Sequence, residues 1–323
     1  MKTCFAAAFL VALCALPAAG QNTPPPQKTA SSGPETIKRE VNLVNVLFTV
    51  TDKKDHTILD LKQDDFRIFE DRQAQTIRFF SRETDLPLRI GVLIDTSNSV
   101  RERLRFEQEA AIDFLNEAVR PGQDQAFVVG FDVEPQVVQD YTDDVDKLST
   151  AIRGLAAGGT TALFDAIYDA CQQKMQVSPP PEPYLRRVLI VVSDGKDNTS
   201  EHSREEALSM AQHSEAIIFA IGTNNSGTNT AGGKMPNGLS QGDKTLIRLA
   251  EQTGGRAFFP FEASDLASSF QEIARELRSQ YSLAYVSTNQ AHDGTFRTIL
   301  LETAEKGMKV RAKAGYYAPS PNK

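Results

Sequence analysis

The stretch RIGVLIDTSNS, residues 89–99, decides the fold of this chain. Residues 90–94 are mostly aliphatic and show no polar alternation, which predicts a strand that is buried on both faces. The strand ends in Asp95, and the hydroxyl residues Ser97 and Ser99 follow within one turn. In an open α/β sheet, ligands bind at the carboxyl ends of the strands. The three side chains offer only oxygen atoms, which suit Mg²⁺, Ca²⁺ or Mn²⁺ better than zinc.

Two segments farther along the chain complete this pattern. Residues 158–167 combine a glycine turn, two threonines and a helical pattern, and residues 187–195 contain a second apolar strand, which ends in Asp194. In this order the three segments resemble the von Willebrand factor A (VWA) domain with a metal-ion-dependent adhesion site, over about residues 88–277. The resemblance implies that a divalent cation, most simply Mg²⁺ with Mn²⁺ or Ca²⁺ as alternatives, is held by Asp95, Ser97, Ser99, Thr161 and Asp194.

Thr161 matches the family's threonine better than Thr160 does. The family residue lies five positions before a small and an aliphatic residue, here Ala166 and Ile167. In the family, a partner protein supplies a carboxylate to the cation, so the resemblance implies an adhesion or assembly module that is bridged to an Asp or Glu of another protein. Any single predicted ligand could instead cap a helix. The occurrence of all five in the family order favours the metal site.

The region from Leu88 to Ser279 alternates apolar strands with amphipathic helices. Strands without polar alternation indicate a sheet covered on both faces, and strand–helix alternation produces right-handed crossovers. We therefore predict an α/β fold with a doubly wound, Rossmann-like, mostly parallel sheet that is flanked by helices. The helices are expected at residues 101–119, 144–155, 163–175, 204–214, 244–253 and 263–279.

The segments before and after this region are both β-rich. Two isolated small sheets would each be marginally stable, so we predict one small β module built from both segments. The early segment 66–70 and the late segment 315–317 also resemble those of bacterial secreted proteins with a VWFA-related domain. The strands are expected at residues 41–50, 66–69, 76–80, 281–285, 296–302 and 308–312.

The N-terminus has the features of a secretory signal peptide. Lys2 precedes an apolar run from Cys4 to Leu16, which is too short to span a bilayer, and small residues follow at 17–20. We expect an exported protein, periplasmic or extracellular, without an integral membrane span. Its remaining cysteine, Cys171, is expected to be a buried small hydrophobe. The predicted regions are a signal peptide at 1–20, a flexible linker at 21–37, a β-rich segment at 38–85, a VWA domain at 86–279 and a second β-rich segment at 280–318.

Charge and motif content narrow the classes of function. The chain has 35 basic and 42 acidic residues and no basic stripe, which disfavours binding to nucleic acid. We expect a non-enzyme, because the sequence has no H-E-x-x-H or G-x-S-x-G motif. Two alternatives stay open: a metal-assisted hydrolase with Asp197 as the general base, and a structural envelope component whose metal site is vestigial. The long segment from Thr223 to Gln241 is either disordered or a partner-selecting flap.

Overall fold

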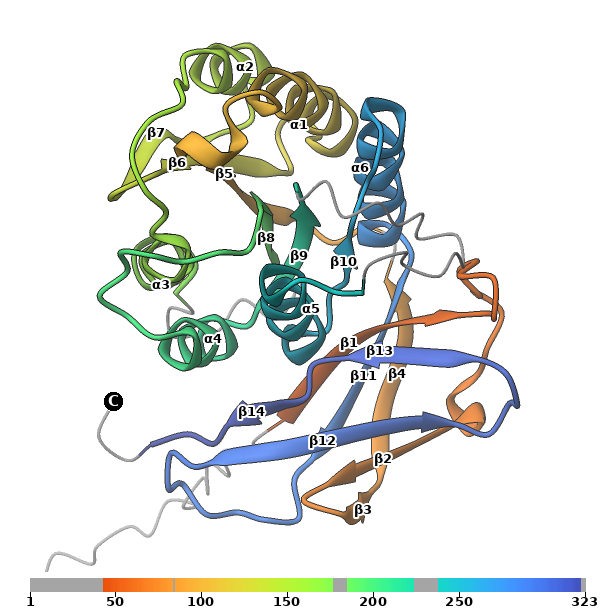
Figure 1. The fold of residues 1–323 in the computed structure, drawn as a ribbon. Coiled ribbons are helices and arrows are strands. Elements are labelled where there is room, and N and C mark those ends of the chain that lie inside the picture. The colour runs from red at the N-terminus through yellow and green to blue at the C-terminus, as the bar shows by residue number, and fades with distance from the viewer. Residues whose placement is uncertain (1–42, 84, 177–184, 224–237, 321–323) are drawn as a thin grey trace, which may run out of the picture. The chain divides into compact units, whose positions relative to one another are not determined.

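The computed structural model describes residues 43–83, 85–176, 185–223 and 238–320. These residues belong to one compact unit that begins at Val41, and they contain a six-stranded sheet and two four-stranded sheets (Figure 1). The predicted signal peptide and linker, and residues 224–237 of the segment predicted to be either disordered or a flap, lie outside the described residues. None of the helices in the described ranges is long and apolar enough to cross a bilayer.

The six-stranded sheet has the order β10-β9-β8-β5-β6-β7. The strand β5 pairs in parallel with β8 on one side and with β6 on the other, and β7 runs antiparallel at the edge. The predicted doubly wound, mostly parallel sheet is therefore confirmed. The strands are β5 (Leu88–Asp95), β6 (Gln125–Phe131), β7 (Pro135–Thr142), β8 (Arg186–Ser193), β9 (Ala216–Gly222) and β10 (Ala257–Phe258).

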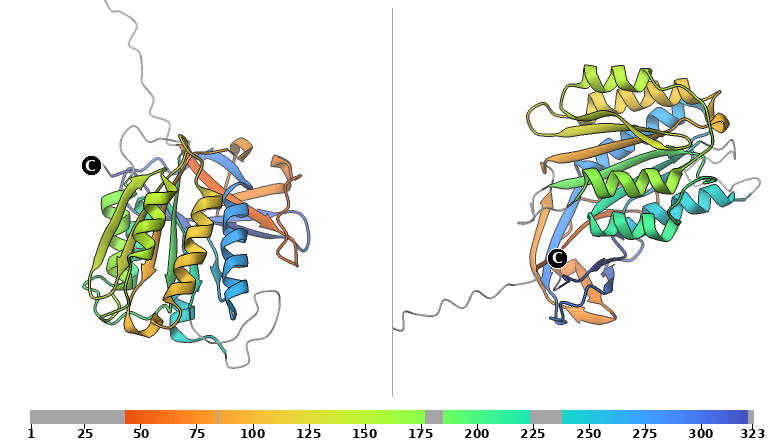
Figure 2. Two further views of the ribbon diagram at one scale, coloured as in Figure 1. Left: turned by 90° about the horizontal axis from the view of Figure 1, so that it is seen from above. Right: turned by 90° about the vertical axis from the view of Figure 1, so that its left-hand side faces the viewer.

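Helices cover both faces of this sheet (Figures 1 and 2). Successive residues of β5 point to opposite faces. Val92 packs in the core that includes α1, α2 and α6, whereas Leu93 packs in the core that includes α3, α4 and α5. Gly91 makes room for the ring of Phe127, because a Cβ atom there would lie 2.4 Å from the ring. The helices are α1 (Leu104–Ala118), α2 (Val145–Arg153), α3 (Leu163–Lys174), α4 (Arg204–His213), α5 (Gln241–Thr253) and α6 (Ala263–Leu277).

Local hydrogen bonds explain where two helix boundaries differ from prediction. The helix α1 begins at Leu104 rather than residue 101, because a short 3-10 helix at Asn98–Val100 first turns the chain. The helix α5 begins three residues earlier than predicted, at Gln241, because the Ser240 hydroxyl accepts a hydrogen bond from the backbone of Asp243 at 3.0 Å.

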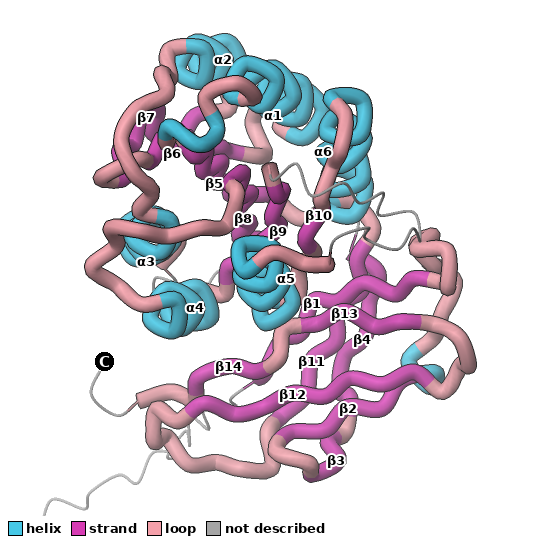
Figure 3. Tube along the Cα trace, viewed as in Figure 1, coloured by secondary structure: helices cyan, strands magenta, loops and turns pink. Residues whose placement is uncertain are grey.

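The remaining strands form two four-stranded antiparallel sheets (Figure 3), called here the β module. The sheet orders are β13-β1-β11-β4 and β14-β12-β2-β3, so strands from both ends of the chain pair in each sheet. Aromatic rings fill the core between them: the centroid of Phe48 lies 5.0 Å from that of Phe66 in an edge-to-face contact and 5.3 Å from that of Tyr281 in a stacked one. The strands are β1 (Leu43–Thr51), β2 (Phe66–Glu70), β3 (Gln73–Gln75), β4 (Ile77–Glu83), β11 (Gln280–Val286), β12 (Phe296–Thr303), β13 (Lys309–Ala312) and β14 (Gly315–Tyr317).

Candidate metal centre

The predicted ligands lie on three loops at one edge of the six-stranded sheet. Because β5 and β8 are parallel neighbours, with Ile94 beside Val192, their carboxyl ends bring Asp95 and Asp194 to the same edge. The third loop precedes α3 and carries Thr161. Its position follows from backbone hydrogen bonds to the other two loops.

The loop after β5 is held by the Asp95 carboxylate, which is fully buried. Its Oδ1 accepts a hydrogen bond from the backbone of Ser97 at 2.9 Å, and its Oδ2 accepts one from the Ser193 hydroxyl at 2.7 Å. The hydroxyl oxygens of Ser97 and Ser99 lie 2.8 Å apart. Burial, together with the negative charge of Asp194, raises the pKa of Asp95. A nearby cation would stabilise the ionised form of this buried carboxylate.

The loop before α3 bonds to both of its neighbours. The backbone of Gly158 donates to the carbonyl of Thr96 at 2.7 Å, and the carbonyl of Thr161 accepts from the backbone of Asn198 at 2.9 Å. Thr161 is buried, whereas Thr160 is exposed and lies with its hydroxyl 3.2 Å from that of Thr199. This difference supports Thr161 as the inward-facing hydroxyl of the pair.

The loop after β8 presents Asp194, which is 4% exposed. Its Oδ1 accepts from the backbone of Lys196 at 3.0 Å, and its Oδ2 pairs with the Lys196 ammonium at 2.8 Å. Gly195 has a φ of 75° and lies against the start of α5, where a Cβ atom would come within 2.3 Å of the Gly242 carbonyl. A glycine is therefore required for this loop to reach the sheet edge.

The donor set fits a hard divalent cation. All five predicted ligands carry oxygen, four of them are buried, and hydrogen bonds join their three loops. In the described ranges no three His, Cys, Asp or Glu side chains form a cluster that could hold a metal by themselves. A cation at this edge would therefore depend on hydroxyl groups and water, as Mg²⁺ commonly does.

A comparison with known protein families identifies the family of this chain. The sequence model of the von Willebrand factor type A domain matches residues 90–276, more than half of the chain. The chain belongs to this family. No curated protein is significantly similar to it in sequence.

Several solved structures are similar to part of this chain. Proximal thread matrix protein 1 from the mussel byssus, with a zinc-occupied MIDAS motif, is 19% identical at a TM-score of 0.48, over 66% of this chain and 50% of that one. BatB from Bacteroides thetaiotaomicron is 17% identical at 0.44, over 59% and 100%. The vWF domain of the type V pilus tip protein Mfa5 from Porphyromonas gingivalis is 15% identical at 0.45, over 59% and 94%. The chain thus spans about half the length of the mussel protein.

Other acidic residues near the VWA site have structural roles. The Asp197 carboxylate accepts from the Ser200 hydroxyl at 2.6 Å and from the backbone of Phe164 at 3.0 Å, at the start of α3. Asp165 accepts from the backbone and ring of His202, at 2.9 and 2.7 Å. Asp197 is thus engaged in shaping the loop, which weakens its candidacy as a general base.

Two side chains at the site were not singled out from sequence. Ser193 orients Asp95, and Glu107 is buried in the first turn of α1, the helix that follows the loop of Ser97 and Ser99. Glu107 could have been noticed, because it lies three residues after Leu104 and four before Ala111, on the apolar stripe of the helix. The role of Ser193 could not be predicted in this way, because a serine before a strand-ending aspartate occurs in many structural settings.

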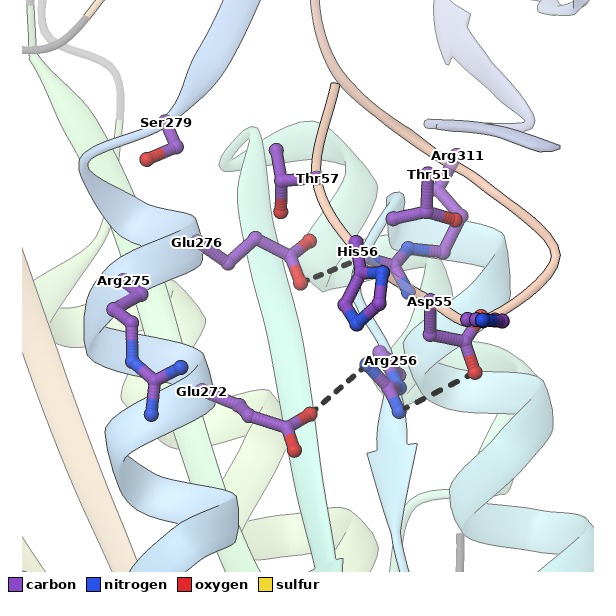
Figure 4. A pocket seen from close by; sticks show the side chains of 11 residues that line it. Thr51, Asp55, His56, Thr57, Arg256, Glu272, Arg275, Glu276, Ser279 and Arg311 are labelled. Atoms are coloured by element: carbon purple, nitrogen blue, oxygen red, sulfur yellow. Dashed lines mark hydrogen bonds and ion pairs between the residues drawn. The ribbon is translucent and has the colours of Figure 1, made fainter. Parts of the chain in front are cut away.

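A cavity with a volume of ≈ 480 Å³ lies elsewhere, where α6 meets the β module (Figure 4). Its walls carry charges of both signs that pair with each other: Arg311 with Glu276 at 2.6 Å, and Arg256 with Glu272 at 3.2 Å. Thr49 also donates to Glu276, at 3.1 Å. None of the five predicted metal ligands lines this cavity, and the contacts of Glu276 with Arg311 and Thr49 join the VWA domain to the β module.

Proposed function

We propose that this protein is an exported binding module that attaches to another protein through a divalent cation at the carboxyl edge of the six-stranded sheet. The observation that carries the proposal is the joining of three separate loops, by backbone and side-chain hydrogen bonds, around a set of buried oxygen atoms. The membership of the chain in the VWA family supports the same conclusion.

The five predicted ligands would contribute two kinds of oxygen atom to the ion, charged and neutral. Asp95 and Asp194 supply negative charge, while Ser97, Ser99 and Thr161 supply neutral oxygens. The Ser193 hydroxyl and the Ser97 backbone hold the Asp95 carboxylate in one orientation. When bound, the cation supplies a centre of positive charge that can accept a further carboxylate oxygen.

The partner is then a protein that offers an accessible Asp or Glu. Neutral hydroxyl ligands leave the ion poorly neutralised, which favours an added anionic ligand over a neutral one. This chemistry suits adhesion or assembly, because the contact depends on one carboxylate and is lost when the cation is removed. We expect Mg²⁺ to be the resident ion.

Calorimetric titration of the metal-stripped protein, lacking only residues 1–20, with Mg²⁺ and Mn²⁺ tests the cation site. We expect saturable binding that the Ser97→Ala/Ser99→Ala double variant loses. A matched control is Ser264→Ala/Ser268→Ala, which removes two hydroxyls from α6 without touching the site loops. Equal affinity of the wild type and the Ser97/Ser99 variant would contradict the site, and absence of binding would favour a vestigial one.

The bridging role needs a second measurement. Capture of partners from the producing organism's envelope proteins is compared in Mg²⁺, in chelator and with Asp95→Ala. A bound protein that is released by chelator and absent with Asp95→Ala would then be tested after its acidic residues are changed to amides. Retention of binding by every such amide variant would contradict a carboxylate bridge.

A further inference from the structure

The carboxylate of Glu107 is buried without any hydrogen-bond partner. Glu107 is 1% exposed, lies in the first part of α1, and neither carboxylate oxygen meets a donor among the described residues. Burial of an ionised carboxylate without partners is strongly unfavourable. Such a group in a folded protein needs an explanation, and an unseen ligand is one of the few available.

The surroundings of Glu107 identify what is missing. After burial itself, the charges of Asp95 and Asp194 raise the pKa of Glu107, whereas the charge of Arg103 lowers it. Glu107 lies in the first turn of α1, and Arg103 at the start of that helix donates to the carbonyl of Thr223. The backbone of Thr223 in turn donates to the carbonyl of Ser193, next to Asp194. These contacts place Glu107 at the sheet edge that carries both predicted metal-binding aspartates. Three carboxylates in one region of the protein repel one another unless one of them keeps a proton or a cation lies between them.

Neither nearby cationic side chain is bonded to Glu107. The guanidinium of Arg103 donates to the carbonyl of Thr223 at 2.8 Å. The ammonium of Lys196 pairs with Asp194, and its side chain is 60% exposed. Both groups bond to other atoms of the site loops, so neither forms an ion pair with Glu107. Another cation is needed to neutralise an ionised Glu107.

We propose that Glu107 is a further binding residue of the cation site, where it accepts hydrogen bonds from water molecules bound to the ion. This inference rests on the proposed function, because it requires a cation at Asp95 and Asp194. Direct ligation by all three carboxylates is not available, since no such cluster is arranged for it in the described residues. Water is the natural link between a buried acceptor and Mg²⁺, which keeps several of its waters in proteins.

Isosteric replacement of Glu107 provides the test. Calorimetric titration with Mg²⁺ and Mn²⁺ is carried out on metal-stripped protein lacking only residues 1–20, as wild type and as Glu107→Gln. Outer residues that orient metal ligands typically change metal affinity by about 10- to 100-fold when substituted. We expect Glu107→Gln to weaken binding within this range. Glu107→Met, whose thioether sulfur is only a weak hydrogen-bond acceptor, should weaken it further.

Glu109→Gln is the matched control for charge. Glu109 lies on the same helix, but it is exposed and pairs with Arg153 at 3.3 Å. The variant removes the same charge from α1, so its affinity should stay within about twofold of the wild type because an exposed charge is well screened. Circular dichroism and the melting temperature of each metal-free variant report whether it is folded.

The possible outcomes separate this inference from the proposed function. Metal binding by the wild type that Ser97→Ala/Ser99→Ala loses and Glu107→Gln keeps undiminished would overturn the role of Glu107 alone. Equal weakening by Glu107→Gln and Glu109→Gln would also overturn it, because the effect would then be one of total charge. A wild type that binds neither ion would overturn both proposals.

Discussion

Two buried glutamates, one in the β module and one in the VWA domain, differ in their hydrogen bonding. Glu70 of β2 is 2% exposed, and its carboxylate accepts from the hydroxyls of Tyr285 at 2.8 Å, Ser287 at 2.5 Å and Tyr316 at 3.0 Å. The guanidinium of Arg297 lies 3.6 Å away. These donors come from strands and turns at the C-terminal end of the chain, so the carboxylate joins both halves of the β module.

Glu107 is buried to the same degree and accepts no hydrogen bond among the described residues. The folded chain itself supplies hydrogen-bond donors to Glu70, whereas the described residues supply none to Glu107. The difference teaches that burial of a charge does not define its role. A completed set of donors indicates a structural carboxylate, and an incomplete set at a sheet edge indicates a group that acts on a ligand.

The largest expected effect is the loss of stability when the completed cluster is broken. Glu70→Ala leaves Arg297, whose side chain is 3% exposed, without its buried counter-charge. Breaking a buried ion pair in this way costs about 3–5 kcal/mol of the free energy of unfolding. Urea unfolding measures the loss.

The control for this prediction is Glu302→Ala, on an exposed position of β12 in the same module. We expect it to change stability by less than about 0.5 kcal/mol. If Glu70→Ala were no more destabilising than Glu302→Ala, the cluster would not be the structural element described above.

The second prediction concerns the pH dependence of the metal-free protein. Burial raises the pKa of Glu107 from 4.5 to about 8. The charges of Asp95 and Asp194 add to this increase, and the charge of Arg103 opposes it. Between these two values the folded state keeps a proton that the unfolded chain has released, so stability falls as pH rises. The wild type should therefore lose stability relative to Glu107→Gln across this range, by at most roughly 1.4 kcal/mol per pH unit.

Urea unfolding of both proteins in chelator, at intervals from pH 4.5 to 8.5, checks this slope. Comparison with Glu107→Gln cancels the contribution of Asp95, whose pKa is also raised by burial but which both proteins contain. Saturating Mg²⁺ should flatten the difference, because a nearby cation favours the ionised carboxylate. Parallel stability curves in chelator would show that Glu107 does not titrate in this range.

The smallest expected effect is on Mg²⁺ affinity and concerns Lys196, the cationic side chain that pairs with Asp194. The ammonium of Lys196 pairs with Asp194 at 2.8 Å and must give way or share that carboxylate when an ion binds. Lys196→Met should therefore tighten Mg²⁺ binding. Exposed ion pairs are worth at most about 1 kcal/mol, which limits the gain to about fivefold. Calorimetric titration measures it.

Lys147→Met, at an exposed lysine of α2 that pairs with Asp144, removes the same charge away from the site. It should leave the affinity unchanged. Weaker binding by Lys196→Met than by Lys147→Met would mean that the lysine supports the metal site rather than competing with an ion.

The alternation of apolar strands with amphipathic helices was sufficient to predict the central fold. Patterns of this kind depend on local chemistry, because a strand buried on both faces must be apolar throughout and a helix must carry one apolar stripe. The predicted helices α2, α3, α4 and α6 all occur in the structure, with boundaries that differ by up to two residues. The starts of α1 and α5 each differ by three residues, because a short 3-10 helix precedes α1 and because Ser240 and Asp243 cap α5.

The candidate ligands were also identified from sequence, because D-x-S-x-S, the threonine loop and the second aspartate occur in a fixed order. Asp95, Ser97 and Ser99 are close in the chain, so their proximity is a local property. Their metal role stays a prediction, to be decided by the titration above. The same holds for the signal peptide, whose residues lie outside the described ranges.

The sequence by itself therefore determined the α/β architecture and the residue types available to a cation, since both are written in local patterns and spacings. Only the tertiary structure decided which distant groups donate hydrogen bonds to each buried carboxylate. Ser193 reaches Asp95 because β8 lies beside β5, and Tyr285 reaches Glu70 because the two ends of the chain share a β module. The isolation of Glu107 arises in the same way, because burial and missing donors are properties of packing between segments far apart in the chain.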